Sequence, residues 1–363
     1  MAEGPPELWS GPLHTRFCDL VGVRWPIVQT GMGWVSGARL TAATSAAGGF
    51  GILAAVTMTD EELRRSVRSV KERTDAPFGV NFRPDQPDLA QRIAFVVAEG
   101  VRLVSFAGAP GAEAVATLHD AGVLCMPTVG ARRHAEKMLG LGVDAVIAQG
   151  AEGGGHTGTV PTSLLLPQVV DAVGTDIPVL GAGGFCDGRG LVAALAWGAD
   201  GVAMGTRFLL TRESHVPDAV KARYLAATVT DTVVTTALDG APQRVIRTPL
   251  VDRLERSGPL TRLPRALRSA LAFRRATGTG VVDLAREGRA MRTAQELTLA
   301  QLAMAANAPM LIKAALVDGD ADAGALPTGQ VTGRIDDVPT VAEVIDGMVA
   351  EAEGTLKRLG AGA

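Results

Sequence analysis

The chain has 363 residues, of which 47% are hydrophobic, 20% charged and only 4% aromatic, with 44 Gly and 20 Pro. This composition excludes a disordered chain and supports a large aliphatic core, and the length suits one large domain with an appendage. Since the net charge of −3 gives no general attraction to anionic polymers or surfaces, neither nucleic acid nor a membrane is expected as a partner.

Targeting and redox signals favour a cytoplasmic protein. The first 20 residues lack the basic start and the apolar run of a secretory signal. The longest apolar stretch, residues 42–58, is interrupted by three glycines and is short for a bilayer. Cys18, Cys125 and Cys186 stand far apart with no CxxC pair, so neither disulfides nor a metal site is expected.

Strand and helix signals alternate through the first 210 residues. Residues 59–73 open with a Thr-Asp-Glu-Glu capping pattern, and residues 132–141 and 189–197 are further helix candidates. Alternation requires crossover connections and parallel strands, so eight such units favour a TIM (β/α)₈ barrel over a doubly wound sheet with the same rhythm. The strands are expected to begin near Ile27, Phe50, Phe78, Leu103, Val123, Ala145, Ile177 and Gly201.

The rhythm changes after Leu210. The following region contains long helical stretches such as residues 298–316, and only residues 232–237 indicate an extended run. The expected organisation is therefore a lead-in over residues 1–25, a barrel over 26–210, a mainly helical cap or extension over 211–326, and a return segment with a terminal helix over 327–363.

One window of the tail is strongly basic. Residues 244–292 hold 12 Arg, no Lys and four acids, a net charge of +8. A solvated helical face explains such a run, and so does an anion site, because guanidinium groups bind phosphate oxygens in pairs.

Two glycine turns form a candidate phosphate site. Phosphates often bind the loops after the seventh and eighth strands of a barrel. The seventh predicted strand runs into Gly-Ala-Gly-Gly-Phe at residues 181–185, and the eighth into Met-Gly-Thr-Arg at residues 204–207. Glycines let backbone N–H groups approach a phosphate, and the Thr206 hydroxyl adds a donor. The alternative is that these glycines only make tight turns.

A histidine follows the sixth predicted strand. Five glycines surround His156 within residues 150–158. Their GxGxxG spacing lies outside the first turn of a Rossmann unit and is interpreted as coincidence. A loop at a strand end places an imidazole beside a bound ligand, so His156 is the candidate catalytic residue among the five histidines.

A series of motifs in the right order resembles the nitronate monooxygenase and enoyl reductase II flavoproteins. The resemblance implies a TIM barrel that binds FMN without a covalent link, with its phosphate at the two glycine turns. The motifs occupy residues 26–35, 46–51, 79–82, 149–158, 181–185, 204–206 and 329–331.

The resemblance also implies a role for each matching residue. His156 would face the substrate, and buried amides would bond the flavin. The implied cofactor contacts are Gly31, Met32 and Asn81 for the ring or ribityl chain, Gln149 and Gly154 for other polar groups, Gly183, Gly184, Gly205 and Thr206 for the phosphate, and Gln330 from the tail.

Two chemistries share this scaffold. In one, a nitronate reduces FMN and oxygen completes the reaction; in the other, hydride passes between flavin and a carbon–carbon bond. His156 suits proton transfer in both. Residues 30–35, Thr-Gly-Met-Gly-Trp-Val, are closer to the Gly-Gly-Met-Ala-Trp-Val of enoyl reductases than to the Ala-Pro-Met of many nitronate monooxygenases, which favours carbon–carbon redox.

The strongest resemblance is to actinobacterial flavin oxidoreductases of steroid C/D-ring degradation, through residues 29–35, 152–158, 185–210 and 216–236. It implies an acyl-CoA substrate, whose phosphates the basic window would hold. With no Rossmann module evident, NAD(P)H or NAD(P)⁺, if used as a co-substrate, would reach the same flavin face rather than a separate domain. A nitronate monooxygenase and a non-catalytic flavin-binding protein are the alternatives, and homo-oligomerisation stays open.

Overall fold

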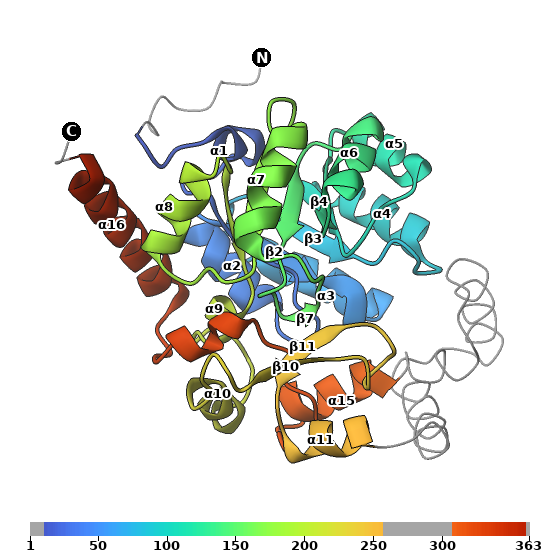
Figure 1. Cartoon of the computed structure of the whole chain (residues 1–363). Helices are drawn as coiled ribbons and strands as arrows, with labels where there is room; N and C mark the ends of the chain where they lie inside the picture. Colours follow the sequence, from blue (N-terminus) through green and yellow to red (C-terminus); the bar gives the residue numbers. More distant parts are fainter. Residues whose placement is uncertain (1–10, 257–306, 361–363) are drawn as a thin grey trace. The chain divides into compact units, whose positions relative to one another are not determined.

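Eight parallel strands form a closed barrel in the computed structural model, which describes residues 11–256 and 307–360 (Figure 1). The ring closes where Val28 pairs in parallel with Ala203. Every barrel strand begins within two residues of its expected start, which confirms the TIM barrel. The barrel strands are β1 (Ile27–Gln29), β2 (Phe50–Ala54), β3 (Phe78–Phe82), β4 (Leu103–Phe106), β5 (Leu124–Val129), β6 (Val146–Gln149), β8 (Val179–Ala182) and β9 (Gly201–Met204).

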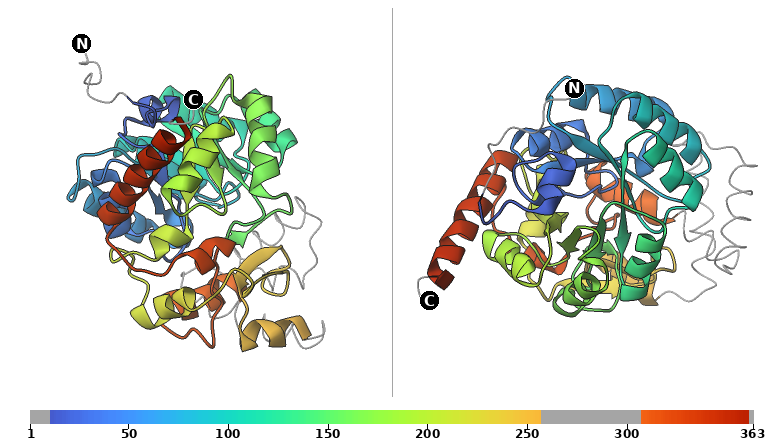
Figure 2. Two further views of the ribbon diagram at one scale, coloured as in Figure 1. Left: turned by 60° about the vertical axis from the view of Figure 1, so that its left-hand side comes forward. Right: turned by 90° about the horizontal axis from the view of Figure 1, so that it is seen from above.

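Helices surround the ring, as the view from above shows (Figure 2). The predicted capping pattern is confirmed at α3, where the Thr59 side chain accepts from the Glu62 N–H and the Glu62 carboxylate accepts from the Thr59 N–H. The elements that follow the strands are α2 (Ala38–Ala46), η1 (Ala55–Thr57), α3 (Asp60–Lys71), α4 (Leu89–Ala98), α5 (Ala112–Asp120), α6 (Arg132–Gly140), α7 (Thr162–Val173), α8 (Gly188–Ala196) and α9 (Thr206–Leu209).

Two terminal helices complete the barrel unit. Helix α1 (Arg16–Val21) covers the amino-terminal end of the strands, because Phe17 and Val21 join the core cluster there and the Phe17 ring meets Phe50 edge-on at 6.1 Å. Helix α16 (Val341–Gly360) packs along α8 (Figure 2). With α1 over the amino-terminal end, ligand chemistry is left to the carboxyl ends of the strands.

The chain divides into two compact units. The described part of the barrel unit falls within Met1–Gly153, Gly158–His215 and Arg334–Ala363. The second unit comprises Gly154–Thr157 and Val216–Gly333. Four residues of the loop after β6 thus belong with a segment that begins about 60 residues later in the chain.

The second unit contains an antiparallel sheet of strand order β10–β11–β7 over a small core that includes Leu238, Val245 and Val251. The sequence indicated β10 alone, because β11 is short and β7 has two residues in a glycine-rich run without readable alternation. Of the helix expected over 298–316, the part before residue 307 lies outside the described residues. The remaining elements are β7 (Gly155–His156), α10 (Asp218–Leu225), β10 (Thr232–Thr235), β11 (Gln243–Ile246), α11 (Pro249–Arg256), α15 (Asn307–Leu316) and η2 (Gln330–Arg334).

Candidate functional site

The turn after β8 has the backbone of an anion site. Gly183 and Gly184 adopt φ values of +97° and +86°, which L side chains rarely tolerate. Successive N–H groups in such turns form concave anion-binding surfaces. A Cβ on Gly183 would lie 3.0 Å from the Gly153 nitrogen and 3.1 Å from Thr162 Oγ1, whereas one on Gly184 would meet only Glu152, at 3.7 Å. Close packing therefore requires glycine at residue 183, and backbone conformation favours it at residue 184.

Thr162 joins this turn to the glycine-rich loop that follows β6. Its Oγ1 lies 2.8 Å from Glu152 Oε2 and 2.9 Å from the Gly183 carbonyl oxygen. The same Glu152 oxygen accepts from the Thr162 N–H at 2.9 Å, at the start of α7. The loop after β6 and the turn after β8 are thus held together by one hydroxyl and one carboxylate.

Four other predicted residues meet at the carboxyl ends of β9, β1 and β3. A Cβ on Gly31 would overlap Asn81, and one on Gly205 would lie 3.3 Å from Met32 Sδ. Asn81 is buried in β3 and donates from Nδ2 to Ser105 Oγ at 2.8 Å. The absence of side chains on the two glycines therefore lets these turns approach one another closely.

Thr206 and Gln149 lie at the same end of the barrel. Thr206 begins α9 directly after β9 and is buried. Gln149 ends β6, and the Gly153 backbone packs on its amide, since a Cβ on Gly153 would lie 2.7 Å from Gln149 Nε2. Eight of the ten residues expected to contact the cofactor thus belong to the barrel unit.

Trp34 adds a strained residue to the turn after β1. It is the only residue other than glycine with positive φ, +64°, in the described ranges. Its buried Nε1–H has no hydrogen-bond partner among the residues that the structure describes, while its backbone N–H donates to Thr57 Oγ1 at 3.2 Å. Backbone strain of this kind clusters at ligand sites, and an unsatisfied indole donor fits a ligand that carries ring carbonyls.

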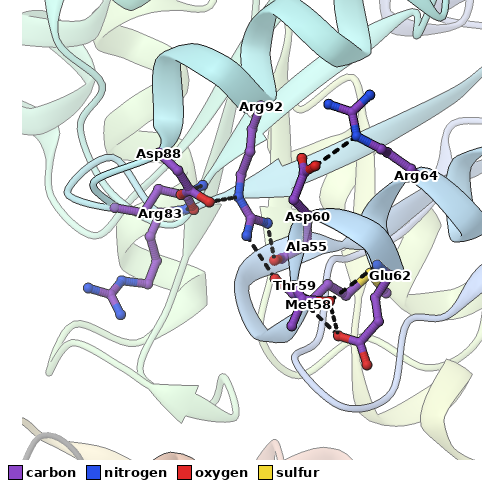
Figure 3. Close-up of polar contacts among 10 residues, drawn as sticks. Ala55, Met58, Thr59, Asp60, Glu62, Arg64, Arg83, Asp88 and Arg92 are labelled. Atoms are coloured by element: carbon purple, nitrogen blue, oxygen red, sulfur yellow. Dashed lines mark hydrogen bonds and ion pairs between the residues drawn. The ribbon is translucent and has the colours of Figure 1, made fainter. Parts of the chain in front are cut away.

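Arg92 holds the loop that supports Trp34. Its buried guanidinium donates to the carbonyls of Ala55 and Met58 at 3.1 and 2.8 Å and bonds Asp88 at 2.6 Å (Figure 3). Ala55 begins η1, the element that carries Thr57. A side chain of α4 therefore stabilises the η1 conformation, which in turn positions the Trp34 turn.

The barrel unit therefore fits a flavin mononucleotide. The glycine turn after β8 suits a phosphate, the side chains of Asn81 and Gln149 provide amides, and Trp34 provides an indole donor that the described residues leave unsatisfied. The phosphate and the polar ring edge thus each find chemically matching groups.

His156 lies in the second unit, in a strand rather than in the predicted loop. Its Nε2 is 2.8 Å from Asp239 Oδ2, with the imidazole side chain 67% exposed and the carboxylate 9% exposed. The Asp239 oxygens also accept from the Ala241 N–H, at 3.0 Å, and from the Gln243 amide. The structure thus places a carboxylate against the predicted catalytic histidine.

Gly154 and Gln330 also belong to the second unit. A Cβ on Gly154 would come within 2.5 Å of the Thr328 carbonyl carbon and 2.6 Å of the Gly329 nitrogen. Gln330 donates from Nε2 to the Val229 carbonyl at 3.3 Å. Gly154 is therefore required by packing against the 328–329 backbone, a reason that its motif did not indicate.

Cys186 has the character of a packing residue. Burial, with a contribution from Asp187, raises the pKa of its thiol to about 11, so the nucleophilic thiolate is scarce at neutral pH. It lines a pocket of about 570 Å³ together with Arg207 and Asp337, and none of the predicted flavin residues takes part in that lining.

Within the described ranges, no helix is both long and apolar enough to span a membrane. The same part of the chain contains no cluster of three or more His, Cys, Asp or Glu that could hold a metal ion.

Sequence reasoning missed the residues that support the site. Asp239 follows Leu238 and precedes Gly240 in what reads as an ordinary turn, and Arg92 is one of many arginines on helices. Trp34 stands out in the sequence only as part of a motif. Only the positive φ of Trp34 and the long-range contacts of the other two distinguish these residues, and neither property can be read from local sequence.

Comparison with known proteins gives a consistent result. The family model described as nitronate monooxygenase matches residues 14–351. Two similar proteins, from Mycobacterium tuberculosis and Rhodococcus jostii, are named (3aS,4S,5R,7aS)-5-hydroxy-7a-methyl-1-oxo-octahydro-1H-indene-4-carboxyl-CoA dehydrogenase. The first is 54% identical over 94% of this chain and 96% of its own length, and the second 54% over 96% and 98%.

Solved structures agree on the fold. FabK from Thermotoga maritima superposes with a TM-score of 0.77 at 33% identity, covering 96% of this chain and 99% of that one. A nitroalkane oxidase from Streptomyces ansochromogenes gives a TM-score of 0.74 at 30% identity, covering 94% and 99%.

Proposed function

Because the chain belongs to the nitronate monooxygenase family of flavin-dependent oxidoreductases, we propose that it is an FMN-dependent dehydrogenase of a bicyclic CoA thioester from steroid ring degradation. The observation that carries this proposal is the 54% identity, along nearly the whole chain, to two proteins named as dehydrogenases of a hydroxy-methyl-oxo-octahydroindene carboxyl-CoA. The expectation of carbon–carbon redox, drawn from residues 30–35, points to the same chemistry.

FMN would be held by the groups of the barrel unit and its neighbouring loops. The turn of Gly183 and Gly184 would bind its phosphate through backbone N–H groups, and bound FMN supplies two-electron redox chemistry. The other proposed contacts are Gly205 and Thr206 for the phosphate, Gly31, Met32 and Asn81 for the ring and ribityl chain, and Gln149, Gly154 and Gln330 for the remaining polar groups.

His156 would handle the proton. Dehydrogenation of a carbon–carbon bond removes one hydrogen with its electron pair and a second as a proton, which requires a base. Two residues separate His156 from Gly153, so the imidazole is tethered to the loop whose backbone packs against the phosphate turn. Its exposed side chain leaves the ring accessible to a substrate.

The proposal includes an electron acceptor and a site for the CoA phosphates. NAD(P)⁺ would serve as the final electron acceptor, and the basic window would hold the CoA phosphates. Within the described part of that window, Arg247 pairs with Asp252 at 3.1 Å and Arg244 donates to Thr232 at 2.9 Å. Most of the window lies outside the described residues.

Anaerobic titration of the purified yellow protein tests the proposal. The CoA thioester named for the relatives is expected to bleach the flavin, and its pantetheine-truncated form to bind more weakly, with a difference that shrinks as salt rises. His156→Ala should retain FMN and lose about 10²-fold or more in turnover. Absence of bleaching by the thioester would contradict the dehydrogenase assignment.

The same preparation tests the second candidate. The family model and the nitroalkane oxidase structure favour oxidation of nitronates as the alternative. Rapid oxygen uptake with propionate 3-nitronate, together with indifference to CoA thioesters, would establish a nitronate monooxygenase. A flavin that no substrate alters would indicate a binding protein without catalysis.

A further inference from the structure

The carboxylate of Asp239 is placed to control which nitrogen of His156 carries a proton. His156 lies in β7 directly opposite Gln243 in β11, so the two side chains share one face of the sheet. Asp239, in the connection between β10 and β11, brings Oδ2 within 2.8 Å of His156 Nε2. The partners are 83 residues apart in the chain and meet only because β7 joins this sheet.

The carboxylate is itself held in place on both oxygens. Oδ1 accepts from the Ala241 N–H at 3.0 Å, across a turn in which Gly240 adopts φ +92°. Oδ2 accepts from the Gln243 amide. An acceptor anchored in this way selects the imidazole form that donates from Nε2.

The carboxylate of this pair is more buried than the carboxylates of the two other histidine–carboxylate pairs among the described residues, of which Asp144, paired with His119, is 23% exposed. In the His14–Asp19 pair the carboxylate is 70% exposed and the imidazole 18% exposed. The order is reversed for His156 and Asp239, at 67% for the imidazole and 9% for the carboxylate. A nearly buried carboxylate offers the imidazole an acceptor in a fixed position, whereas an exposed carboxylate of a surface ion pair does not.

We infer that Asp239 is a positioning residue that holds the His156 imidazole with its proton on Nε2 and fixes the orientation of the ring for proton transfer. This inference rests on the proposed role of His156 in proton transfer. Asp239 touches neither the substrate nor the cofactor in this scheme. Gln243 donates to the Asp239 carboxylate, and its amide nitrogen also lies 3.2 Å from His156 Nε2, so it orients the carboxylate from within the same cluster.

The tautomer is measured directly on the holoenzyme labelled with ¹⁵N-histidine, at about pH 8.5, where an ordinary imidazole is neutral. Long-range ¹H–¹⁵N spectra distinguish the protonated ring nitrogen, and His156→Gln identifies the His156 signals by their loss. The wild type is expected to carry the proton on Nε2. In Asp239→Asn the amide can donate to Nε2, so the proton is expected on Nδ1, with a fall in turnover of about 10²-fold or more.

Controls separate a structural effect from a positioning effect. Asp19→Asn makes the same chemical change at the His14 pair and should leave turnover and the His156 signals unchanged. Asp239→Ala, with flavin absorbance and circular dichroism as folding markers, should lose the fixed tautomer without gaining the opposite one. A loss of thermal stability alone would not move the proton of His156 from Nε2 to Nδ1.

The outcomes are distinct. An unchanged tautomer in Asp239→Asn, or wild-type turnover of that variant beside an impaired His156→Gln, overturns the inference and leaves the proposed function standing. Full activity of His156→Gln overturns the proposed proton-transfer role, whatever the spectra of the Asp239 variants show.

Discussion

Replacing Gly184 with alanine is expected to weaken FMN binding through the phosphate alone. At φ +86°, an L residue costs about 1–2 kcal/mol of the free energy of unfolding, and its Cβ meets protein only as an ordinary contact with Glu152 at 3.7 Å. Relaxation of the left-handed turn would move a backbone N–H away from the phosphate. Loss of one charge-assisted hydrogen bond costs about 1.5–3 kcal/mol, which corresponds to a roughly 10- to 100-fold rise in the FMN dissociation constant.

The assay compares two ligands and two variants. Flavin fluorescence measures binding of FMN and of riboflavin, which lacks the phosphate, to the apoprotein. Gly142→Ala is a matched control, because Gly142 has φ +80° with nothing within 4 Å of an added Cβ and follows α6 at the amino-terminal end of the barrel strands. Both variants should lose similar stability, while Gly184→Ala alone loses FMN affinity and keeps its riboflavin affinity within about twofold.

Equal weakening of FMN and riboflavin by Gly184→Ala would refute the phosphate assignment, because the substitution would then act on the ring or on the fold. Unchanged FMN affinity would refute it as well. Weakened FMN binding in Gly142→Ala would show that general destabilisation, rather than the turn, controls flavin retention.

Three further outcomes are expected. Arg92→Met leaves two carbonyls and Asp88 without their donor, so the free energy of urea unfolding should fall by about 2–4 kcal/mol. The exposed control Arg65→Ala should change it by no more than about 0.5 kcal/mol. Equal losses in the two variants would contradict the stabilising role of Arg92. Thr162→Val should weaken FMN binding by about 5- to 10-fold, because the contact with the Gly183 carbonyl is lost; unchanged fluorescence titrations would count against that link. Burial raises the pKa of Cys125 to about 12, so the unfolded thiol, with its ordinary pKa near 9.0, releases its proton first and stability falls as pH rises through 9 to 12. Cys125→Ala should make this alkaline loss shallower in unfolding measured at several pH values, and an unchanged slope would contradict the assignment.

The barrel was predictable because its signals are local. Each strand is a short, mostly apolar run with Gly or Pro close to one of its ends, and the alternation of strands and helices requires parallel pairing. The Thr59 capping box was readable for the same reason, since its partner lies three residues away. The sheet of the second unit was not, because β7 has only two residues and finds its partner strand far along the chain.

The residues of the candidate site also divide into those with local sequence signals and those defined by long-range contacts. His156 and the glycine turns carry local signals, and their functional roles remain predictions. Asp239, Arg92 and Thr162 act through contacts between distant segments, such as the 83 residues between His156 and Asp239. No local motif predicts such pairs, because an aspartate in a turn or an arginine on a helix is common and does not indicate which distant residue it contacts.

The division of the chain into two units has an evolutionary consequence. The imidazole and its carboxylate partner belong to one unit, whereas the Gly183–Gly184 turn belongs to the other. Sequence changes within residues 216–333 can therefore alter the surroundings of His156, Asp239 included, while the Gly183–Gly184 turn is inherited unchanged. A chain divided in this way can vary the partners of its proposed base without altering its proposed phosphate turn.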